Sequence, residues 1–235
     1  MRNAISEIGL SLQKAIWTKR AESWEQMENP GLNRVVEAVL EFSNPAKTGT
    51  AIDLGCGSGQ LALPLAKRFE KVIAVDISPK MIEILENKAK DLGLKNIETQ
   101  VGALQHLNFA PESVDLVVSN YVLHHLSDPE KAKIIETSAK WLRPGGQIVI
   151  GEMMFGRGLT PQDRAIISSK LVEFVKRGPA GWWRIIKNVG RFVFRLQEKP
   201  ISQSAWRRIF EGAGLVEIEI KPIVAEAAVG IARRS

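Results

Sequence analysis

The chain has 235 residues, of which 45% are hydrophobic and 25% charged, a composition typical of soluble globular proteins. No apolar run approaches the roughly 18 residues of a membrane-spanning helix, and the first residues lack the continuous apolar core of a signal peptide. The single cysteine, Cys56, excludes an internal disulfide and any multi-cysteine metal site, so we expect a reducing, cytoplasmic setting and no bound metal.

The formal net charge is +6, and the positive charge is concentrated in one segment. Residues 157–199 contain ten Lys and Arg but three acidic residues, so this segment carries +7. Such a local excess points to a partner rather than to general solubility.

The first part of the chain predicts helices, and the part that follows alternates strands with helices. Apolar periodicity predicts helices over residues 4–27 and 31–43. Beyond them we expect strands at 50–54, 71–76, 97–101, 114–120 and 147–152, separated by helices at 60–69, 78–92 and 129–142. Several of these strands are apolar throughout, as burial on both faces requires. The pattern predicts an α/β fold with a doubly wound, mostly parallel sheet.

The end of the chain has a different pattern. Residues 215–223 alternate apolar and charged side chains, and the apolar stretch at 225–234 follows too closely for a helical crossover. We therefore expect the last two strands to form an antiparallel pair. We expect one domain, 1–235, made of N-terminal helices (1–45), a core (48–152), a basic helical insert after the fifth strand (153–202) and C-terminal strands (203–235).

Three glycines follow the first predicted strand, in the sequence AIDLGCGSGQ at residues 51–60. Gly55, Gly57 and Gly59 come after the acidic Asp53, where a strand turns into a helix and ligands of α/β sheets bind. The dinucleotide fingerprint fails because Gln60 stands where its last glycine belongs, and the P-loop ending is also absent. The loop therefore favours close approach of a ligand without strong phosphate binding.

A second acidic residue, Asp76, ends the second predicted strand. A carboxylate at this position can accept hydrogen bonds from the hydroxyls of a ribose. Together with the glycine loop, it predicts a ligand that carries a ribose but no pyrophosphate.

Four segments in order, AIDLGCGSG, VIAVDISPKMIE, SVDLVVSNYVLHHL and WLRPGGQIVIGE, resemble the class I S-adenosylmethionine-dependent methyltransferases, in particular their small-molecule branch. The resemblance covers roughly residues 48–152, and the last strands fit the family as well. It implies S-adenosylmethionine as cofactor. It also implies a Rossmann-like sheet of seven strands, with the last strand antiparallel between the fifth and the sixth.

The resemblance also implies roles for individual residues. Asp53 and the glycine loop would hold the methionine end of the cofactor, Asp76 the ribose, and Ile77 would lie against the adenine. The sequence departs from the family at Ala103, where an aspartate often binds the adenine amino group. The full set of expected cofactor residues is Asp53, Gly55, Cys56, Gly57, Gly59, Asp76, Ile77, Gly102, Ala103, Leu104, Asn120 and Trp24.

Two adjacent histidines follow the fourth predicted strand and are the candidate catalytic residues. His124 or His125 could be a general base if the acceptor must lose a proton. The alternative is that the pair only packs and caps a short helix. Cys56 is expected to be a small turn residue, because a thiolate nucleophile needs an electropositive pocket.

The aromatic residues outside the core are the candidate substrate contacts. Trp17 and Trp24 lie seven residues apart, on one face of the first helix, which in similar enzymes covers the cofactor and substrate as a lid. They could equally dock that helix on the domain. The expected substrate contacts are Trp17, Tyr121, Trp182 and Trp183.

The basic insert contains GWWRIIKNVGRFVFRL at residues 181–196. As a helix it would place its basic residues on one face and its aromatic residues on others, as in helices at membrane surfaces. Its alternatives are a pocket cover with a solvated basic face and, less favoured, a contact with RNA.

The sequence thus predicts transfer of a methyl group to a small organic acceptor, with a lipophilic, membrane-associated acceptor among the candidates. An RNA methyltransferase and a cofactor-binding protein without turnover are the alternatives. The acceptor atom and the oligomeric state are not predicted.

Overall fold

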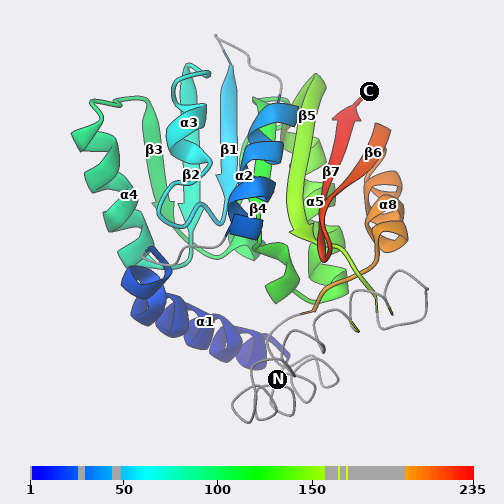
Figure 1. Ribbon diagram of the computed structural model, residues 1–235, viewed down its shortest axis with the longest axis horizontal. Helices are drawn as coiled ribbons and strands as arrows, with labels where there is room; N and C mark the ends of the chain where they lie inside the picture. Colours follow the sequence, from blue (N-terminus) through cyan, green and yellow to red (C-terminus); the bar gives the residue numbers. More distant parts are fainter. Residues whose placement is uncertain (1, 26–29, 44–48, 157–163, 165–167, 169–198) are drawn as a thin grey trace.

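The structure is a computed structural model that describes residues 2–25, 30–43, 49–156, 164, 168 and 199–235. Within these residues the chain forms one seven-stranded sheet in the order β3-β2-β1-β4-β5-β7-β6. The strands are β1 (Thr50–Leu54), β2 (Lys71–Asp76), β3 (Ile97–Val101), β4 (Val114–Asn120), β5 (Leu142–Met153), β6 (Leu215–Val224) and β7 (Ala227–Arg234). Figure 1 shows the sheet and the helices around it.

The pairing of the strands confirms the predicted topology. The pairs from β3 across to β5 are parallel, whereas β7 is antiparallel to both of its neighbours, β5 and β6. The strand order reverses between β1 and β4, so the carboxyl ends of these two strands flank a crevice of the kind in which α/β sheets bind ligands.

Helices cover both faces of the sheet. On one face lie α2 (Pro30–Phe42), α3 (Ala62–Leu65) and α4 (Pro79–Asp91), and on the other lie α5 (Asp128–Trp141) and α8 (Gln203–Gly212). Successive side chains of β1 point to opposite faces of the sheet. Ala51 packs in the core with Val35 and Leu65, whereas Ile52 packs in the core on the α5 side. Burial on both faces therefore explains the unbroken apolar runs of the central strands.

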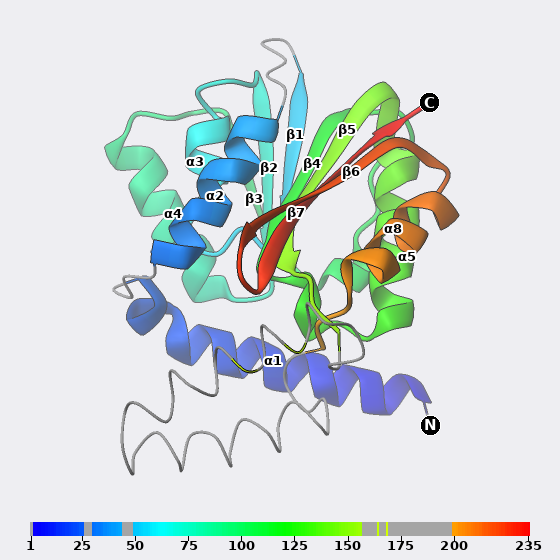
Figure 2. The ribbon, with the colours of Figure 1, turned by 45° about the vertical axis from the view of Figure 1, so that its right-hand side comes forward.

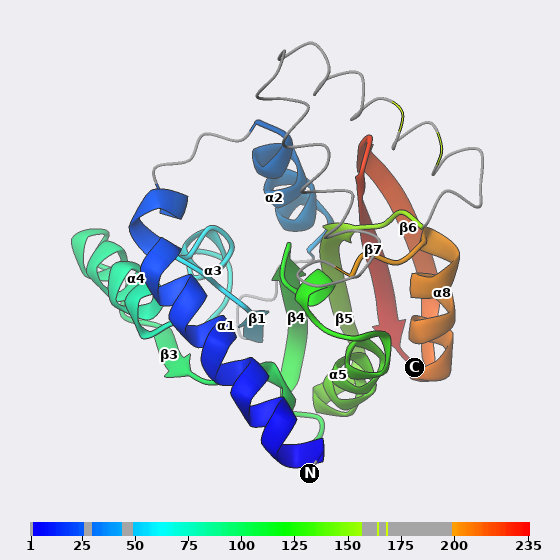
Figure 3. The same ribbon diagram turned by 90° about the horizontal axis from the view of Figure 1, so that it is seen from below.

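The longest helix, α1 (Arg2–Glu25), lies apart from these two layers. It crosses beneath the carboxyl ends of the parallel strands, as Figures 2 and 3 show from two directions, and contacts the end of α4. Within the described residues no helix is long and apolar enough to cross a membrane.

Two predicted elements differ from the structure. The helix predicted at 60–69 is helical only at Ala62–Leu65, because from Lys67 on the backbone closes tighter turns onto Pro64 and Leu65. The fifth strand begins at Leu142 rather than 147. A register irregularity admits its Arg-Pro-Gly-Gly sequence, since Val114 pairs with Leu142 but Leu116 with Gln147.

Most of the predicted basic insert lies outside the described residues. The division into one domain with an insert therefore stays a prediction.

Candidate active site

A cavity opens at the carboxyl edge of the sheet, between the ends of β1, β2 and β4 and the helix α1. It holds about 950 Å³ of empty space that is continuous with solvent. Its wall comes from the glycine loop after β1, the segment after β3 and the segment after β4. Its remaining side is formed by Gln13, Trp17 and Trp24 of α1.

The glycine loop contributes open backbone to this cavity. Gly57 has a φ of +51°, and a β-carbon built on it would meet no atom within 4 Å, so the loop leaves room for a ligand at this point. Gly55, with a φ of +73°, is required for a different reason: a side chain there would overlap Val122. The backbone N–H of Gly55 donates to Val75 O at 2.7 Å, which holds the loop against β2.

The two acidic residues of the predicted site differ in their hydrogen bonds. Asp76 accepts the backbone N–H of Gly57 at its Oδ2 (3.0 Å) and that of Ser78 at its Oδ1 (2.8 Å). Asp53 is 1% exposed, and its Oδ2 has no hydrogen-bond partner among the described residues. A buried oxygen without a partner is costly, which makes Asp53 a candidate group for binding a ligand.

The environment of these carboxylates favours their protonated forms in the absence of a ligand. Burial raises the pKa of Asp53 to about 8, against a hydrogen bond from the Ala62 backbone, and the nearby Asp76 raises it further. Burial also raises the pKa of Asp76, while the N–H groups of Ser78 and Gly57 oppose the change. A cationic ligand group bound nearby would favour the charged forms of both carboxylates and lower their pKa values.

The segment after β4 brings polar and aromatic groups to the same cavity. The Oδ1 of Asn120 is buried and has no partner among the described residues, and a β-carbon on Gly151 would come within 2.5 Å of it. Tyr121 has a φ of +53°, a strained value for a non-glycine residue, and its N–H donates to Gly151 O at 2.9 Å. Burial raises the pKa of Tyr121, so its hydroxyl stays protonated.

The two histidines of the short helix η2 (Leu123–His125) lie ring against ring but have different surroundings. His125 lines the cavity, and its ring lies 5.3 Å from that of Trp17. His124 is buried, and its Nδ1 lies 2.7 Å from Oε1 of Glu152, which is fully buried at the end of β5. Of the two predicted candidates, only His125 therefore meets the space in which an acceptor could lie.

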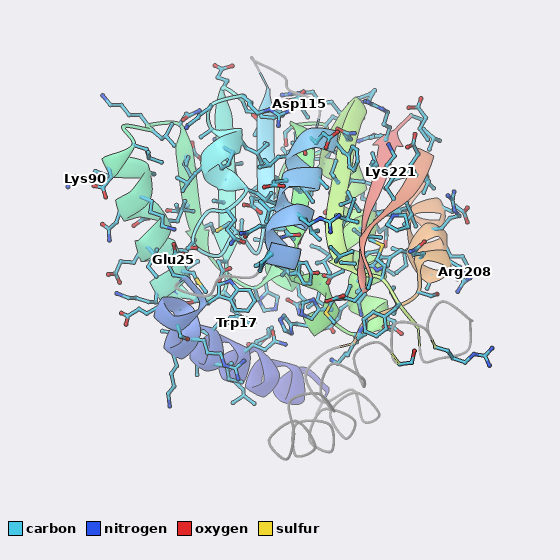
Figure 4. The ribbon with its side chains drawn as sticks, viewed as in Figure 1. Trp17, Glu25, Lys90, Asp115, Arg208 and Lys221 are labelled. Atoms are coloured by element: carbon cyan, nitrogen blue, oxygen red, sulfur yellow. The ribbon has the colours of Figure 1, made fainter. Side chains whose placement is uncertain are left out.

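The helix α1 is tied to the rest of the site at its C-terminal half. Trp17 and Trp24 meet edge to face at 5.4 Å, as their spacing predicts, and Figure 4 shows Trp17 between α1 and the sheet. Thr18 lies 3.3 Å from the Ser78 hydroxyl, and Glu25 forms an ion pair with Lys88. These contacts place aromatic rings over the cavity.

Most of the residues predicted from the sequence thus gather around one cavity, although their roles stay proposals. Those that line it are Asp53, Gly55, Cys56, Gly57, Asp76, Ile77, Gly102, Ala103, Leu104, Asn120, Tyr121, His125, Trp17 and Trp24. Gly59 and His124 lie outside the lining. Trp182, Trp183 and the rest of residues 181–196 lie outside the described residues. Burial raises the pKa of Cys56 well above its ordinary value, in keeping with the expected role as a small turn residue.

Sequence reasoning missed several residues of this site. Gln13 was not expected, because nothing in a helix sequence tells which polar residue faces a distant cavity. Met81 and Leu126 were not among the expected site residues, although both line the cavity. Glu152 was missed because its partner, His124, lies 28 residues away.

The seven-stranded sheet with its antiparallel β7, the glycine loop and the two buried aspartates define a cofactor-binding α/β protein of the methyltransferase type. Residues 51–146 match the family described as "Methyltransferase domain". These residues form the methyltransferase domain of the class I S-adenosylmethionine-dependent methyltransferases.

Known proteins similar to this chain agree with that assignment. Phosphoethanolamine N-methyltransferase 1 of Triticum aestivum is 32% identical over 172 residues, covering 66% of this chain and 33% of that protein. Ubiquinone biosynthesis O-methyltransferase of Aliivibrio fischeri is 30% identical over 141 residues, covering 60% and 58%. A SAM-dependent methyltransferase structure from Aquifex aeolicus has the same fold, with a TM-score of 0.62, 18% identity and coverage of 92% and 98%.

The chain spans less than two thirds of the length of these two curated relatives. The cofactor of the family nevertheless fits the residues present here. The unpartnered oxygens of Asp53 and Asn120 are acceptors for an ammonium group, and Asp76 keeps lone pairs for ribose hydroxyls. The open space at Gly57 admits a ligand beside the backbone.

Proposed function

We propose that this protein transfers a methyl group from S-adenosylmethionine to a small organic acceptor bound beneath α1. The observation that carries the proposal is the pair of buried oxygens without a partner among the described residues, on Asp53 and Asn120, two residues that line the cavity. Both are acceptors, and both lie at the strand ends where the sheet order reverses.

Each described residue of the cavity has a role in this reaction. The cofactor, when bound, supplies a methyl group already activated by a sulfonium centre. Asp53 and Asn120 would hold the ammonium end, and Asp76 the ribose. Ile77, Met81 and Leu104 would enclose the adenine in an apolar pocket. Fixing these ends orients the methyl group toward Tyr121 and His125, which converts an encounter of two molecules into a positioned reaction.

The walls near Tyr121 and His125 favour an uncharged, partly apolar acceptor. Trp17 and Leu126 lie beside these residues, and no lysine or arginine is among the described residues that line the cavity. A phosphate-bearing acceptor such as the one in the name of the wheat relative lacks a cationic partner there. A phenolic or related ring hydroxyl fits this lining better, and it resembles the O-methylation in the name of the Aliivibrio relative.

His125 is the residue proposed to receive the proton of such a hydroxyl. We expect His125→Gln to lower kcat by about 10²-fold, because general-base assistance contributes about that much, and to leave cofactor affinity within twofold. His106→Gln is the matched control, since His106 is exposed and lies outside the cavity lining. Equal kcat values for the two variants would remove His125 from the mechanism.

The experiment that tests the function as a whole is a screen for S-adenosylhomocysteine release with a panel of phenols, hydroquinones and amines. Release that depends on one acceptor supports the proposal. Tight cofactor binding without release from any acceptor would favour the alternative of a cofactor-binding protein without turnover.

We further propose a lipophilic acceptor reached at a membrane surface. Its support is the basic and aromatic sequence of residues 181–196, which is outside the described part of the chain, together with the apolar cavity wall. The test is flotation with anionic liposomes of wild type against a variant with Arg184, Lys187, Arg191 and Arg195 changed to Ala. Flotation of wild type alone supports the proposal. Absence of flotation with salt-sensitive binding to RNA would favour the RNA methyltransferase alternative.

A further inference from the structure

Glu152 lies outside the cavity lining, and both of its carboxylate oxygens contact His124 of η2. Its Oε2 accepts the backbone N–H of His124 at 3.0 Å, and its Oε1 lies 2.7 Å from the His124 Nδ1. The backbone N–H of Met153 also donates to Oε1, at 2.7 Å. One buried carboxylate thus fixes both the main chain and the ring of His124 to the end of β5.

This attachment determines where the next residue lies. His124 and His125 are consecutive in the three-residue helix η2, so a fixed His124 leaves little freedom to His125. The two imidazole rings have their centroids 4.0 Å apart, and on its other side the His125 ring meets Trp17. The backbone N–H of Lys199 donates to His124 O at 2.6 Å, which holds the turn from a third direction.

We propose that Glu152 and His124 form a buried, charge-paired support that holds His125 in the cavity in its neutral form. Glu152 and His124 are then positioning residues, and His125 is the group that meets the acceptor. The inference rests on the proposed function only for what His125 does there. The arrangement itself can be tested without any acceptor.

The charges around the site agree with this arrangement. Burial has the largest single effect on the pKa of Glu152 and raises it, but the attraction to His124 together with the hydrogen bonds from His124 and the Met153 backbone lowers the pKa below its ordinary value, as expected for a carboxylate in an ion pair. A positive charge on His124, one ring away, disfavours a second positive charge on His125. Among the described residues, the other titratable groups that line the cavity are Asp53 and Asp76 at the ends of β1 and β2, Cys56, and Tyr121 after β4. Glu226, in the turn between β6 and β7, is close enough to Tyr121 to act on its pKa.

Nuclear magnetic resonance can test the support directly, because the chain has three histidines. The imidazole signals would be titrated from pH 5 to pH 9 and assigned with His106→Gln and His125→Gln. We expect His124 to keep one charge state over this range, and His125 to titrate below its ordinary pKa. In Glu152→Gln, which keeps the shape but removes the charge, the buried His124 loses the carboxylate that keeps it protonated and becomes neutral. With the nearer positive charge gone, the pKa of His125 should rise by about one unit.

Two further variants keep the test decisive. His124→Asn removes the cation, and we expect it to raise the pKa of His125 as well. This second variant replaces Glu152→Gln if that protein does not fold. Glu98→Gln is the matched control, because Glu98 is exposed on the edge strand β3 and pairs with Lys71. A His125 pKa that is unchanged or lowered in both test variants would overturn the proposal.

The failure of this inference is distinguishable from the failure of the proposed function. Cofactor affinity should stay within twofold in Glu152→Gln, because none of the proposed cofactor contacts involves Glu152. With an active acceptor, the same variant should lower kcat with little change in KM for the cofactor, and Glu152→Asp should restore part of the loss. If no acceptor is found, the His125 titration still decides the positioning role.

Discussion

Two buried carboxylates at the same edge of the sheet are in opposite states. At the end of β1, Asp53 is 1% exposed and has an oxygen without a partner among the described residues. At the end of β5, Glu152 is 0% exposed and accepts hydrogen bonds from two residues. Burial raises the pKa of Asp53 to about 8, whereas the contacts of Glu152 lower its pKa despite burial.

This difference in hydrogen bonding separates a carboxylate suited to bind a ligand from one that supports the surrounding fold. A carboxylate that the fold leaves unsatisfied lowers stability until a ligand arrives, so it is retained for what it binds. A carboxylate whose partners are all within the fold stabilises and positions them. The region around Asp53 is therefore expected to change its energetics on cofactor binding, while the region around Glu152 holds one geometry throughout.

The largest effect that would sharpen this comparison is expected from Asp53→Asn. The loss of a charged contact to the cofactor should weaken S-adenosylmethionine binding by about 10²-fold, measured by calorimetry. The ligand-free variant should be more stable than wild type at pH 8, with a melting temperature higher by a few degrees. A variant that is both less stable and normal in binding would contradict the assignment of Asp53.

The same two residues predict opposite pH dependences of stability. Because the folded protein holds the proton of Asp53 more tightly than the unfolded chain, Asp53 lowers stability progressively as pH rises from about 4 to about 8. Glu152, whose folded pKa is lowered, contributes stability above its ordinary pKa of 4.5, and loses it as pH falls through the folded value. Urea unfolding should show a stability difference between wild type and Asp53→Asn that grows with pH from about 4 to about 8, and a difference between wild type and Glu152→Gln that vanishes as pH falls below 4.5.

The glycine loop gives a second, smaller contrast. Gly55→Ala should lower stability by about 2–4 kcal/mol, because the new methyl group overlaps Val122 and the backbone has a positive φ. Gly57→Ala, with open space at its β-carbon, should lower stability by about 1 kcal/mol. Its cofactor affinity should nevertheless fall by about tenfold, because the methyl group occupies ligand space. Denaturant unfolding measures the stability of both variants, and calorimetry measures their cofactor affinity. The contrast would be refuted if Gly55→Ala and Gly57→Ala lost the same stability and the same affinity.

How far the sequence predicts this molecule depends on the distance between interacting residues. The core strands, the glycine loop and the positions of Asp53 and Asp76 at the cavity follow from local patterns, because each pattern lies within a few residues. The short α3 was not predicted, since the tighter turns after Pro64 leave no mark on the apolar periodicity. The early start of β5 was hidden by the Arg-Pro-Gly-Gly sequence, which resembles a turn.

The site residues divide in the same way. Trp17 and Trp24 were expected together because seven residues bring side chains to one helical face. Glu152 gave no local signal, because a single glutamate at the end of an apolar strand resembles a solvated strand end. Only the fold brings it to His124, and the burial of His124 on Glu152 leaves His125 as the histidine that lines the cavity.

The smallest effect is expected where α1 meets α4. Glu25→Gln removes an ion pair with Lys88 that is partly exposed, so stability should fall by less than about 1 kcal/mol.

Tryptophan fluorescence should respond to cofactor binding in wild type, and an unchanged signal in a variant that keeps only Trp24 would count against a role of Trp24 as a cofactor contact.

The central claim is that the unsatisfied Asp53 binds the cofactor, and proton release on binding tests it most directly. S-adenosylmethionine would be titrated into wild type and Asp53→Asn at pH 7, in two buffers with different ionisation enthalpies. Because ligand-free Asp53 is mostly protonated at this pH, wild type should bind with release of about one proton, and the variant should bind weakly without that release. Wild-type binding without proton release, or no binding, would contradict the account.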